Sequence, residues 1–506
     1  MRLLFVTSEA YPLAKTGGLA DVSRALPIAL KRRGIDARLL LPGYPGALEH
    51  IENPRILAEL APMLGISGAT LVSGRLPATN VPVFLIDAPS LFRRDGGIYQ
   101  SGNGQDWPDN ALRFAFLSHV GAKLAMGRLG LTWRPDIVHA NDWHAGLLPL
   151  LLSLEPAPRP KTIFTAHNMA FQGNFAPGIL PAAGVPEDCF RCGQIELYGQ
   201  ASFLKAGLCY SDRVTTVSPT YAREILTPEF GFGLDGLLRE RGDDFVGILN
   251  GIDDASWDPA TDIHLPRSFR LGDVSGKRVC KAALQRELGL PVSPKAPLIG
   301  FVSRIAHQKM ADAILAVLPW LAERGAQFVL LGEGDRELEA EFAQAQERHP
   351  GCVAVRIGYD EALAHRLQAG SDILLAPARF EPCGLTQLYA LRYGTLPIVR
   401  RTGGLADTVV DANARTIADR TATGFVFDDA SLEALTAALE RALALYTKPL
   451  TWRRLQLQAM VQDFSWDISA DRYISLYRDV AGIAPADGTD ASLDLIATEV
   501  QRHVAI

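Results

Sequence analysis

A seven-residue segment that combines a basic residue with paired glycines occurs twice in the chain. The first copy is Lys15-Thr16-Gly17-Gly18-Leu19-Ala20-Asp21 and the second is Arg401-Thr402-Gly403-Gly404-Leu405-Ala406-Asp407. Each copy follows a short apolar run and precedes a helix-like run. Glycine lets a backbone approach a ligand closely, and the N–H groups at a helix start attract anions. The two copies therefore predict two domains, each offering a loop to an anionic, phosphorylated ligand.

Other chemically useful side chains also follow short apolar runs. They are Glu9, Asn141, Asp142, His144, His167 and Asn168 in the first half, and Arg304, Lys309, Tyr359, Glu381 and Thr386 in the second. Parallel strands end at one edge of their sheet, which is where folds of this kind bind ligands. One such residue alone, for example His144, is more often a core or capping residue. Their clustering after successive strands predicts a functional site.

The apolar runs predict two sheets of parallel strands. Continuous apolar runs are typical of strands buried on both faces, and their alternation with helical patterns is typical of doubly wound α/β domains. The expected strands are 3–7, 37–41, 81–86, 137–140, 162–165, 214–217 and 247–249, then 298–302, 328–331, 353–357, 373–376, 397–400 and 425–427. We predict two Rossmann-like domains that face a central cleft.

A non-periodic stretch separates the two series of strands. It runs over about 250–270 and contains Asn250-Gly251 and several prolines, which are turn signals. We predict an N-terminal domain over 1–255 and a second Rossmann-like domain over 256–460. The segment 461–506 is predicted to be helical and to pack back on the N-terminal domain, with a loop at 484–488.

Composition narrows the class of protein. The chain has 506 residues, of which 48% are hydrophobic and 21% charged, as in globular proteins. Fifty basic against 56 acidic residues give a net charge of −6, which disfavours a nucleic-acid partner. No apolar run is long enough for a membrane span, and the first run is too short for a signal peptide. Six scattered cysteines suit a reducing compartment, so we expect a cytoplasmic protein without a membrane or nucleic-acid partner.

Several motifs of other enzyme classes are missing from the sequence. There is no Asp-x-Asp pair for a metal–diphosphate complex, no phosphate-binding loop of the ATPase type, and no dinucleotide fingerprint after the first strand. We therefore expect no metal and no cofactor. Arg304 and Lys309 instead offer fixed positive charge where a diphosphate could leave.

The ordered set of motifs resembles the bacterial glycogen synthases and plant starch synthases, which have the two-domain glycosyltransferase-B fold. The resemblance covers the chain up to about Tyr477. It is carried by Lys15 to Val22, Asp142-Trp143-His144, Thr165 to Asn168, Leu249 to Asp253, Ser303-Arg304 with Gln308-Lys309, Arg379 to Gln387 and Arg400 to Val409. It implies transfer of glucose from ADP-glucose to the non-reducing end of an α-1,4-glucan, with retention of configuration. It also implies that the domain over 1–255 is the acceptor side and that the domain over 256–460 binds the nucleotide sugar.

The resemblance also implies roles for individual residues. Arg304 and Lys309 match the pair that holds the donor diphosphate, and Lys15 and Gly18 match an N-domain loop that closes on it. Glu381 matches the acidic residue that faces the donor sugar, in a catalytic set with Asp142, His167, Arg304 and Lys309. The substrate-binding set adds Asn250 near the sugar, Tyr359 against adenine, Cys383 in the same motif as Glu381, and Gly384, Leu385 and Thr386 at phosphate and ribose.

Two positions depart from the family pattern. Met310 stands where the family usually has glycine after the lysine, and Asn141 stands where histidine is common. Two other functions remain open at this point. One is a retaining glycosyltransferase of the same fold that uses UDP-glucose or a small acceptor, and the other is a catalytically silent glucan-binding protein.

Overall fold

The computed structural model describes residues 1–483, and they form two compact units. Unit 1 comprises Met1–Thr215, Phe232–Ile248 and residues 467–483, and unit 2 comprises Thr216–Gly231 and Leu249–Trp466. The chain thus changes unit more often than the predicted boundaries at 255 and 461 imply. The predicted loop at 484–488 lies outside the described residues. Within residues 1–483, no helix is both long and apolar enough to cross a bilayer.

Unit 1 is built on a nine-stranded sheet with the order β12-β11-β7-β6-β1-β2-β5-β4-β3. The four neighbouring pairs from β7 to β5 are parallel, whereas β3–β4 and β4–β5 are antiparallel. The strands are β1 (Arg2–Val6), β2 (Asp36–Pro42), β3 (Glu52–Glu59), β4 (Thr70–Arg75), β5 (Pro82–Asp87), β6 (Ile137–Asn141), β7 (Lys161–Ala166), β11 (Arg213–Thr216) and β12 (Phe245–Gly247). A small antiparallel sheet contains β8 (Asn174–Phe175), β9 (Glu196–Leu197) and β10 (Gln200–Ser202).

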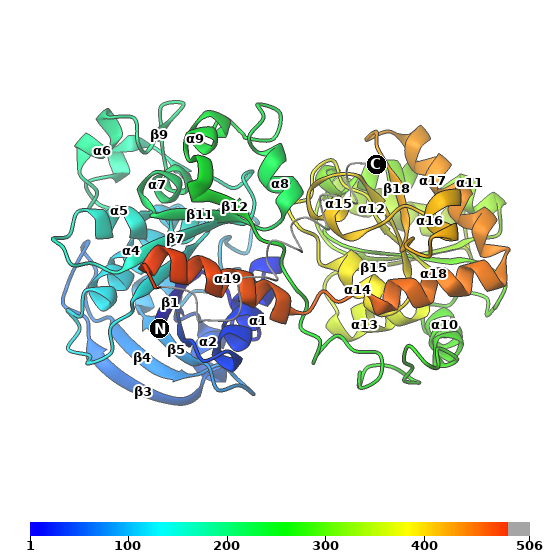
Figure 1. The fold of residues 1–506 in the computed structure, drawn as a ribbon, viewed down its shortest axis with the longest axis horizontal. Coiled ribbons are helices and arrows are strands. Elements are labelled where there is room, and N and C mark those ends of the chain that lie inside the picture. The colour runs from blue at the N-terminus through cyan, green and yellow to red at the C-terminus, as the bar shows by residue number, and fades with distance from the viewer. Residues whose placement is uncertain (484–506) are drawn as a thin grey trace. The chain divides into compact units, whose positions relative to one another are not determined.

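Helices pack against both faces of the unit 1 sheet (Figure 1). The helices of this unit are α1 (Gly18–Arg32), α2 (Pro45–His50), α3 (Pro89–Phe92), α4 (Asn110–Ala125), α5 (Leu147–Ser153), α6 (Glu187–Arg191), α7 (Phe203–Tyr210), α9 (Asp235–Glu240) and α19 (Trp466–Ala481). Although α19 comes last in the sequence, it lies beside α1 (Figure 1). Arg33, just after α1, forms ion pairs with Asp467 and Asp471 of α19. The buried His139 of β6 contacts the Tyr477 hydroxyl at 2.8 Å, which ties α19 to the sheet.

Unit 2 contains a six-stranded parallel sheet with the order β15-β14-β13-β16-β17-β18. The strands are β13 (Leu298–Val302), β14 (Gln327–Gly332), β15 (Val353–Ile357), β16 (Ile373–Ala376), β17 (Leu396–Arg400) and β18 (Phe425–Phe427). The helices are α8 (Pro219–Glu224), α10 (Gly276–Glu287), α11 (Ala311–Glu323), α12 (Arg336–Arg348), α13 (Glu361–Gly370), α14 (Thr386–Arg392), α15 (Gly403–Thr408), α16 (Ala414–Ala418), α17 (Leu432–Tyr446) and α18 (Pro449–Val461). In Figure 1, α10, α13, α14 and α18 lie on one side of the sheet, and α11, α12 and α17 lie on the other.

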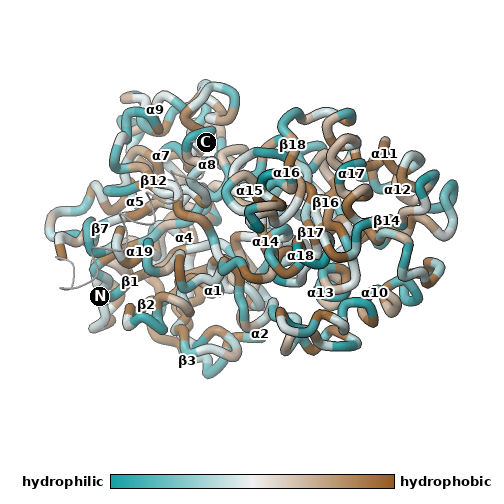
Figure 2. Tube along the Cα trace, turned by 45° about the vertical axis from the view of Figure 1, so that its right-hand side comes forward, coloured by the Kyte–Doolittle hydropathy of each residue, from teal (hydrophilic) through white to brown (hydrophobic). Residues whose placement is uncertain are grey.

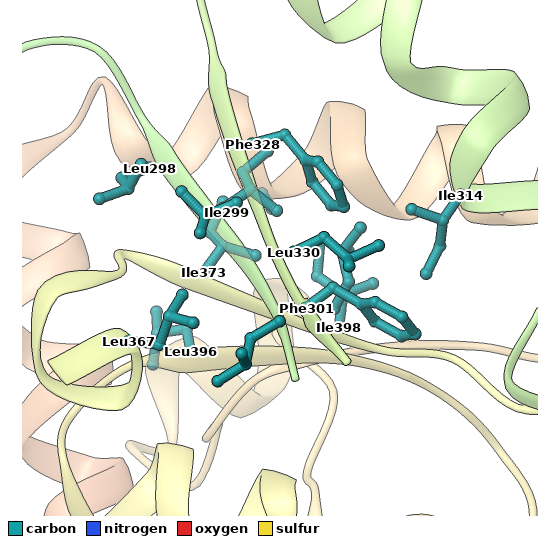
Figure 3. Packing of buried hydrophobic residues seen from close by; sticks show 14 of the residues in the cluster. Leu298, Ile299, Phe301, Ile314, Phe328, Leu330, Leu367, Ile373, Leu396 and Ile398 are labelled. Atoms are coloured by element: carbon teal, nitrogen blue, oxygen red, sulfur yellow. The ribbon is translucent and has the colours of Figure 1, made fainter. Parts of the chain in front are cut away.

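The core of unit 2 explains why its strands are continuous apolar runs. Side chains from neighbouring strands, such as Ile299, Phe301 and Ile373, are fully or almost fully buried and pack together (Figure 3). Outer helices such as α10 and α12 instead alternate hydrophilic and hydrophobic residues along the chain (Figure 2). Such helices bury one face and leave the other to water. Side-chain caps fix several helix starts, for example Asp335, which accepts from the backbone N–H groups of Glu337 and Leu338.

All six strands predicted for unit 2 are present within one residue of their expected ends. In unit 1, β3 and β4 were not expected from the sequence. Nearly every residue of β3 is exposed, and the strand contains a proline and several charges. A strand at the sheet edge that buries almost nothing has no apolar pattern by which to recognise it.

Candidate active site

Each of the two large sheets has a point between parallel strands where the strand order reverses, and polar residues gather at both points. In unit 2 this point lies between β13 and β16, and in unit 1 it lies between β1 and β6. In open α/β sheets, ligands bind beside such a point at the carboxyl ends of the strands. Lys309 and Glu381 follow β13 and β16, while Glu9 and Asp142 follow β1 and β6. The topology therefore defines one candidate site in each unit.

A pocket of about 250 Å³, open solvent included, lies at the switch point of unit 2. Its walls come from the ends of β13 and β16 and from the segments that follow them. It is lined by Phe301, Ser303, Lys309, Leu375, Ala376, Pro377, Glu381, Thr386, Gln387 and Leu405. Three of the predicted site residues, Lys309, Glu381 and Thr386, thus line the same pocket.

Lys309 and Glu381 contact each other in this pocket. The Lys309 ammonium donates to Glu381 Oε2, and both side chains are largely buried, with exposed fractions of 20% and 12%. Removing one partner of a buried ion pair leaves the other charge uncompensated, which strongly destabilises the folded state. In the unliganded pocket each residue therefore satisfies the charge of the other. A ligand with its own negative charge would compete with Glu381 for the ammonium.

Hydrogen bonds hold the segment that carries Glu381 in place. Gln308 donates from its side chain to the Phe380 carbonyl at 3.1 Å, and its own carbonyl accepts from the Arg379 N–H at 2.8 Å. Arg379 is paired with Asp312 at 2.8 Å, at the start of α11. Arg304, the other predicted diphosphate ligand, is exposed and donates to the Gln308 amide oxygen at 3.3 Å. Gln308, which the sequence did not mark as a site residue, therefore links the basic and acidic sides of the pocket.

The second glycine-pair loop packs against the Glu381 segment. A Cβ at Gly403 would lie 1.8 Å from the Glu381 carbonyl oxygen, and one at Gly404 would lie 2.2 Å from the Cys383 carbonyl oxygen. The Gly403 N–H donates to the Glu224 carboxylate at 3.0 Å, and the Gly404 N–H donates to the backbone carbonyls of residues 381 and 382. These N–H groups are thus bonded within unit 2, and the expectation of an anionic ligand at this copy stays a prediction. Its glycines allow close backbone packing that positions Glu381.

The first glycine-pair loop differs from the second in what surrounds it. A Cβ at Gly17 would meet nothing within 4 Å, so this backbone is open to approach. The N–H groups of Thr16 and Gly17 donate to Glu9 Oε2 at 2.6 and 3.1 Å. Lys15 forms an ion pair with Asp21 at 2.9 Å, and Gly18, the first residue of α1, is exposed. Two nearly identical sequences therefore have different environments, which only the tertiary contacts reveal.

Glu9, which follows β1, is a further candidate site residue that the predicted set did not contain. It is 4% exposed and accepts a hydrogen bond from the Tyr99 hydroxyl at 2.5 Å, besides those from the loop. Burial raises its pKa above the ordinary value for glutamate, although the hydrogen bonds oppose that shift. The signal in the sequence was its place directly after the first strand.

Asp142 has a strained backbone, with φ 55° and ψ 178°. This region is populated almost only by glycine and costs other residues about 1–3 kcal/mol. The Asp142 carboxylate accepts a hydrogen bond from the backbone N–H of His167 at 2.7 Å. Burial raises the pKa of Asp142 to about 7, and the nearby Glu9 charge adds to the shift. Strain and a perturbed acid at the end of a central strand are typical of functional sites.

His167 is neutral, and its ring orientation is fixed by Asn141. Burial lowers the pKa of His167 to about 3. The Asn141 amide nitrogen donates to the carbonyls of Val6 and His139, so its oxygen faces His167 Nε2 at 3.0 Å. That oxygen can only accept, so Nε2 carries the proton and Nδ1 is the acceptor of the ring. Asn141, which departs from the family pattern, therefore defines the tautomer of a predicted catalytic residue.

The remaining predicted residues lie in unit 2. Asn250 and Cys383 are buried, and the Asn250 side-chain oxygen has no hydrogen-bond partner among the described residues. Burial raises the pKa of the Cys383 thiol to about 12, so it is not a nucleophile at neutral pH. Gly384 has φ 73°, which favours glycine, and Leu385 precedes α14. Tyr359 is 62% exposed in the loop after the edge strand β15, away from the switch point.

Met310 explains why the family favours glycine at its position. Its φ of 52° and ψ of 33° place it in the left-handed region. That conformation costs a residue with a side chain roughly 1–2 kcal/mol. The Met310 side chain is nevertheless fully buried in the unit 2 core, where it offsets that cost. A residue other than glycine thus adopts the left-handed backbone that follows Lys309.

Family models match both halves of the chain. Residues 2–240 match the starch synthase catalytic domain, and residues 289–454 match glycosyl transferases group 1. Together with two α/β units built on largely parallel sheets, these matches define the protein as a glycosyltransferase of the B fold.

Relatives of known name narrow the class further. The chain is 52% identical over 492 residues to a glycogen synthase of Burkholderia thailandensis, covering 97% of this chain and 92% of the relative. A glycogen synthase of Paramagnetospirillum magneticum is 51% identical over 95% of this chain and 98% of its own. The catalytic domain of Starch Synthase IV from Arabidopsis thaliana, solved with ADP and acarbose, aligns with a TM-score of 0.86 at 34% identity, covering 95% and 99% of the two chains. The chain belongs to the glycogen and starch synthase family.

Proposed function

We propose that this enzyme transfers glucose from ADP-glucose to the non-reducing end of an α-1,4-glucan, with retention of configuration. The observation that carries the proposal is the pocket at the unit 2 switch point, in which Lys309 and Glu381 form an ion pair. The names of the relatives support the same activity, and the solved relative is bound to ADP and acarbose.

Lys309 and Arg304 hold the diphosphate of the donor in this proposal. Breaking the bond to the anomeric carbon builds negative charge on the leaving group, and positioned cations stabilise that charge most in the transition state. Glu381 faces the sugar, on which positive charge develops. Thr386, Gly384 and Leu385 contact phosphate and ribose, Tyr359 packs on the adenine, and Asn250 and Cys383 complete the substrate-binding set.

Unit 1 supplies further groups in this proposal. Asp142 and His167 lie beside the transferred glucose, and Lys15 and Gly18 of the open loop bind the diphosphate. A neutral His167 with a fixed tautomer accepts or donates one defined hydrogen bond and adds no charge. In this proposal Asp142 and His167 therefore recognise sugar hydroxyls, whereas Lys15 and Gly18 contact the phosphate groups.

The chemistry proposed here uses neither a metal nor a cofactor. Fixed cations on Lys309 and Arg304 take the part that a divalent ion plays beside a diphosphate in other enzymes. We also propose that the enzyme acts in the cytoplasm, since all six cysteines are unpaired. A nucleic-acid partner is not proposed, because the net charge is −6.

The proposal is tested by measuring nucleotide release from ADP-glucose and from UDP-glucose, each with and without glycogen. We expect glycogen-dependent release of ADP, lengthened glucan chains, and the same rate in EDTA. Preference for UDP-glucose or for a small acceptor would favour the alternative enzyme. Absence of turnover with either donor, in folded protein that still binds glycogen, would favour a silent binding protein.

A further inference from the structure

Unit 2 contains a segment, residues 216–231, whose neighbours on both sides in the chain belong to unit 1. It carries α8, which lies beside α15 (Figure 1). None of the residues that the sequence predicted for the site lies in this segment. Ser218, Thr220 and Glu224 nevertheless form hydrogen bonds with the backbone that follows Glu381 and with the second glycine-pair loop.

Ser218 holds the peptide that follows Glu381. Its hydroxyl donates to the Pro382 carbonyl at 2.6 Å and accepts from the Tyr221 N–H at 3.2 Å, which caps the start of α8. The Ser218 side chain is fully buried. A buried hydrogen bond is costly to lose, because the remaining partner is left where water cannot replace it. Ser218 therefore fixes the backbone directly after Glu381.

Glu224 binds the second glycine-pair loop from the end of α8. Its two carboxylate oxygens accept from the Gly403 N–H at 3.0 and 3.1 Å, and one of them also accepts from the Thr402 hydroxyl at 3.0 Å. Burial raises the pKa of Glu224, whereas these hydrogen bonds and the Arg400 charge oppose that shift. Charge-assisted hydrogen bonds are among the stronger ones in proteins, and these join two segments that lie 179 positions apart in the chain.

The loop that receives these bonds contacts the Glu381 backbone directly. A Cβ at Gly403 would lie 1.8 Å from the Glu381 carbonyl oxygen, and the Gly404 N–H donates to that oxygen at 3.2 Å. The N–H and the hydroxyl of Thr220 donate to the Asp407 carboxylate at 2.8 and 2.6 Å, which holds the other end of the loop. Because no side chain separates the two backbones, a displacement of the loop also displaces Glu381.

We propose that Glu224 and Ser218 are positioning residues, which hold the Glu381 carboxylate where positive charge develops on the donor sugar. The inference rests on the proposed function, because Glu381 faces a sugar only in that reaction. Neither residue is among the described residues that line the pocket, so both act through the backbone around Glu381. A displacement of about 1 Å in a catalytic group can lower a rate by about 10²-fold, so these contacts affect turnover as well as stability.

The first test measures kcat and ADP affinity of Glu224→Ala in the full chain, on folded samples well below the melting temperature. We expect kcat to fall at least about tenfold, while ADP affinity stays unchanged because Lys309 and Arg304 hold the diphosphate. Glu224→Gln keeps an oxygen for the Gly403 N–H and should recover most of the kcat. Glu229→Ala removes an exposed carboxylate from the same segment and should equal the wild type. A lower melting temperature with unchanged kcat in Glu224→Ala would overturn the proposal.

The second test asks whether Glu224 acts through Glu381. Residues that act through one another give losses that do not multiply. Adding Glu224→Ala to Glu381→Gln should therefore lower kcat much less than it does in the wild type, and adding Ser218→Ala should behave in the same way. Losses that multiply fully would show that Glu224 acts independently of Glu381 and would overturn the proposal.

Amide hydrogen exchange separates this inference from the proposed function, because it needs no turnover. In Glu224→Ala, peptides that cover 379–385 and 401–408 should exchange faster than in the wild type, and in Glu229→Ala they should not. Faster exchange in a wild-type background that lacks turnover would contradict the proposed function alone. Faster exchange at 401–408 with unchanged exchange at 379–385 would show that the loop does not hold the Glu381 segment, and would overturn the inference.

Discussion

At the scale of single residues, the structure reveals backbone strain and the hydrogen-bond or ion-pair partners of the candidate site residues, neither of which the sequence shows. Asp142 and Met310 both have backbone conformations that favour glycine, and neither conformation could be read from residue types. The roles of Lys309 and Glu381 were expected individually, but their direct pairing was not. The tautomer of His167 likewise depends on two backbone carbonyls that hold Asn141, and these come from separate strands.

The first residue-scale prediction concerns pH and Asp142. Its pKa in the folded protein is about 7, above the 3.8 of an unperturbed aspartate. Between these values the folded state holds a proton that the unfolded state has released, so this group makes stability fall as pH rises, by up to about 1.4 kcal/mol per unit. The melting temperature of the wild type, compared with Asp142→Asn, should therefore decline from pH 5 to pH 7 and then level off.

Activity should change in the opposite direction. If the ionised Asp142 interacts with the sugar, kcat/KM of the wild type should increase as pH rises through about 7. Asp142→Asn should show a lower rate without that increase. Parallel melting curves for the two proteins across pH would show that Asp142 has an ordinary pKa, and would remove this argument.

The second residue-scale prediction reverses the usual order of glycine and alanine. Met310→Ala and Met310→Gly both lose a buried side chain, which costs about 2–5 kcal/mol. Alanine retains the left-handed strain and glycine does not, so Met310→Gly should be more stable by about 1 kcal/mol. Unfolding in urea measures the difference. Ala316→Gly, on the exposed face of α11, is the control and should destabilise by about 1 kcal/mol.

At the scale of elements, the strands that build the sites could be predicted and the loops could not. The six strands of unit 2 are continuous buried runs, which the sequence displays directly. Strand β3 buries almost nothing and gives no such signal. The two glycine-pair loops have almost the same sequence, yet Gly403 packs on the Glu381 carbonyl and Gly17 faces open space. Local sequence does not encode which backbone another segment approaches.

These loops give a matched pair of substitutions. Gly403→Ala should displace the Glu381 segment, because its Cβ would overlap the Glu381 carbonyl oxygen and its φ is 44°. We expect a lower melting temperature and a loss of kcat of at least about tenfold, since a small misplacement of a catalytic group is costly. Gly17 has a φ of −149° and no atom near its Cβ position, so the Gly17→Ala variant should have the melting temperature of the wild type. Equal melting temperatures for both variants would contradict the packing role of Gly403.

At the scale of the whole molecule, the fold class and the enzyme family follow from sequence, while the assignment of residues 216–231 to unit 2 does not. Two series of apolar strands predicted two α/β domains, and the structure has two such units. Residues 216–231 nevertheless belong to unit 2. Thr220 of this segment donates to Asp407 at 2.6 Å, and Glu224 binds the loop at Gly403. Such contacts between distant segments leave no periodic pattern in the sequence.

The central claim is that Lys309 and Glu381 form the donor site, and the Glu381→Gln variant tests it most directly. The measurement is kcat with ADP-glucose and glycogen, with ADP affinity determined on the same folded samples. Because glutamine releases the Lys309 ammonium, ADP affinity should stay equal or increase, while kcat falls by about 10²–10³-fold. Lys309→Ala should instead weaken both. Folded Glu381→Gln protein with full turnover would contradict the account.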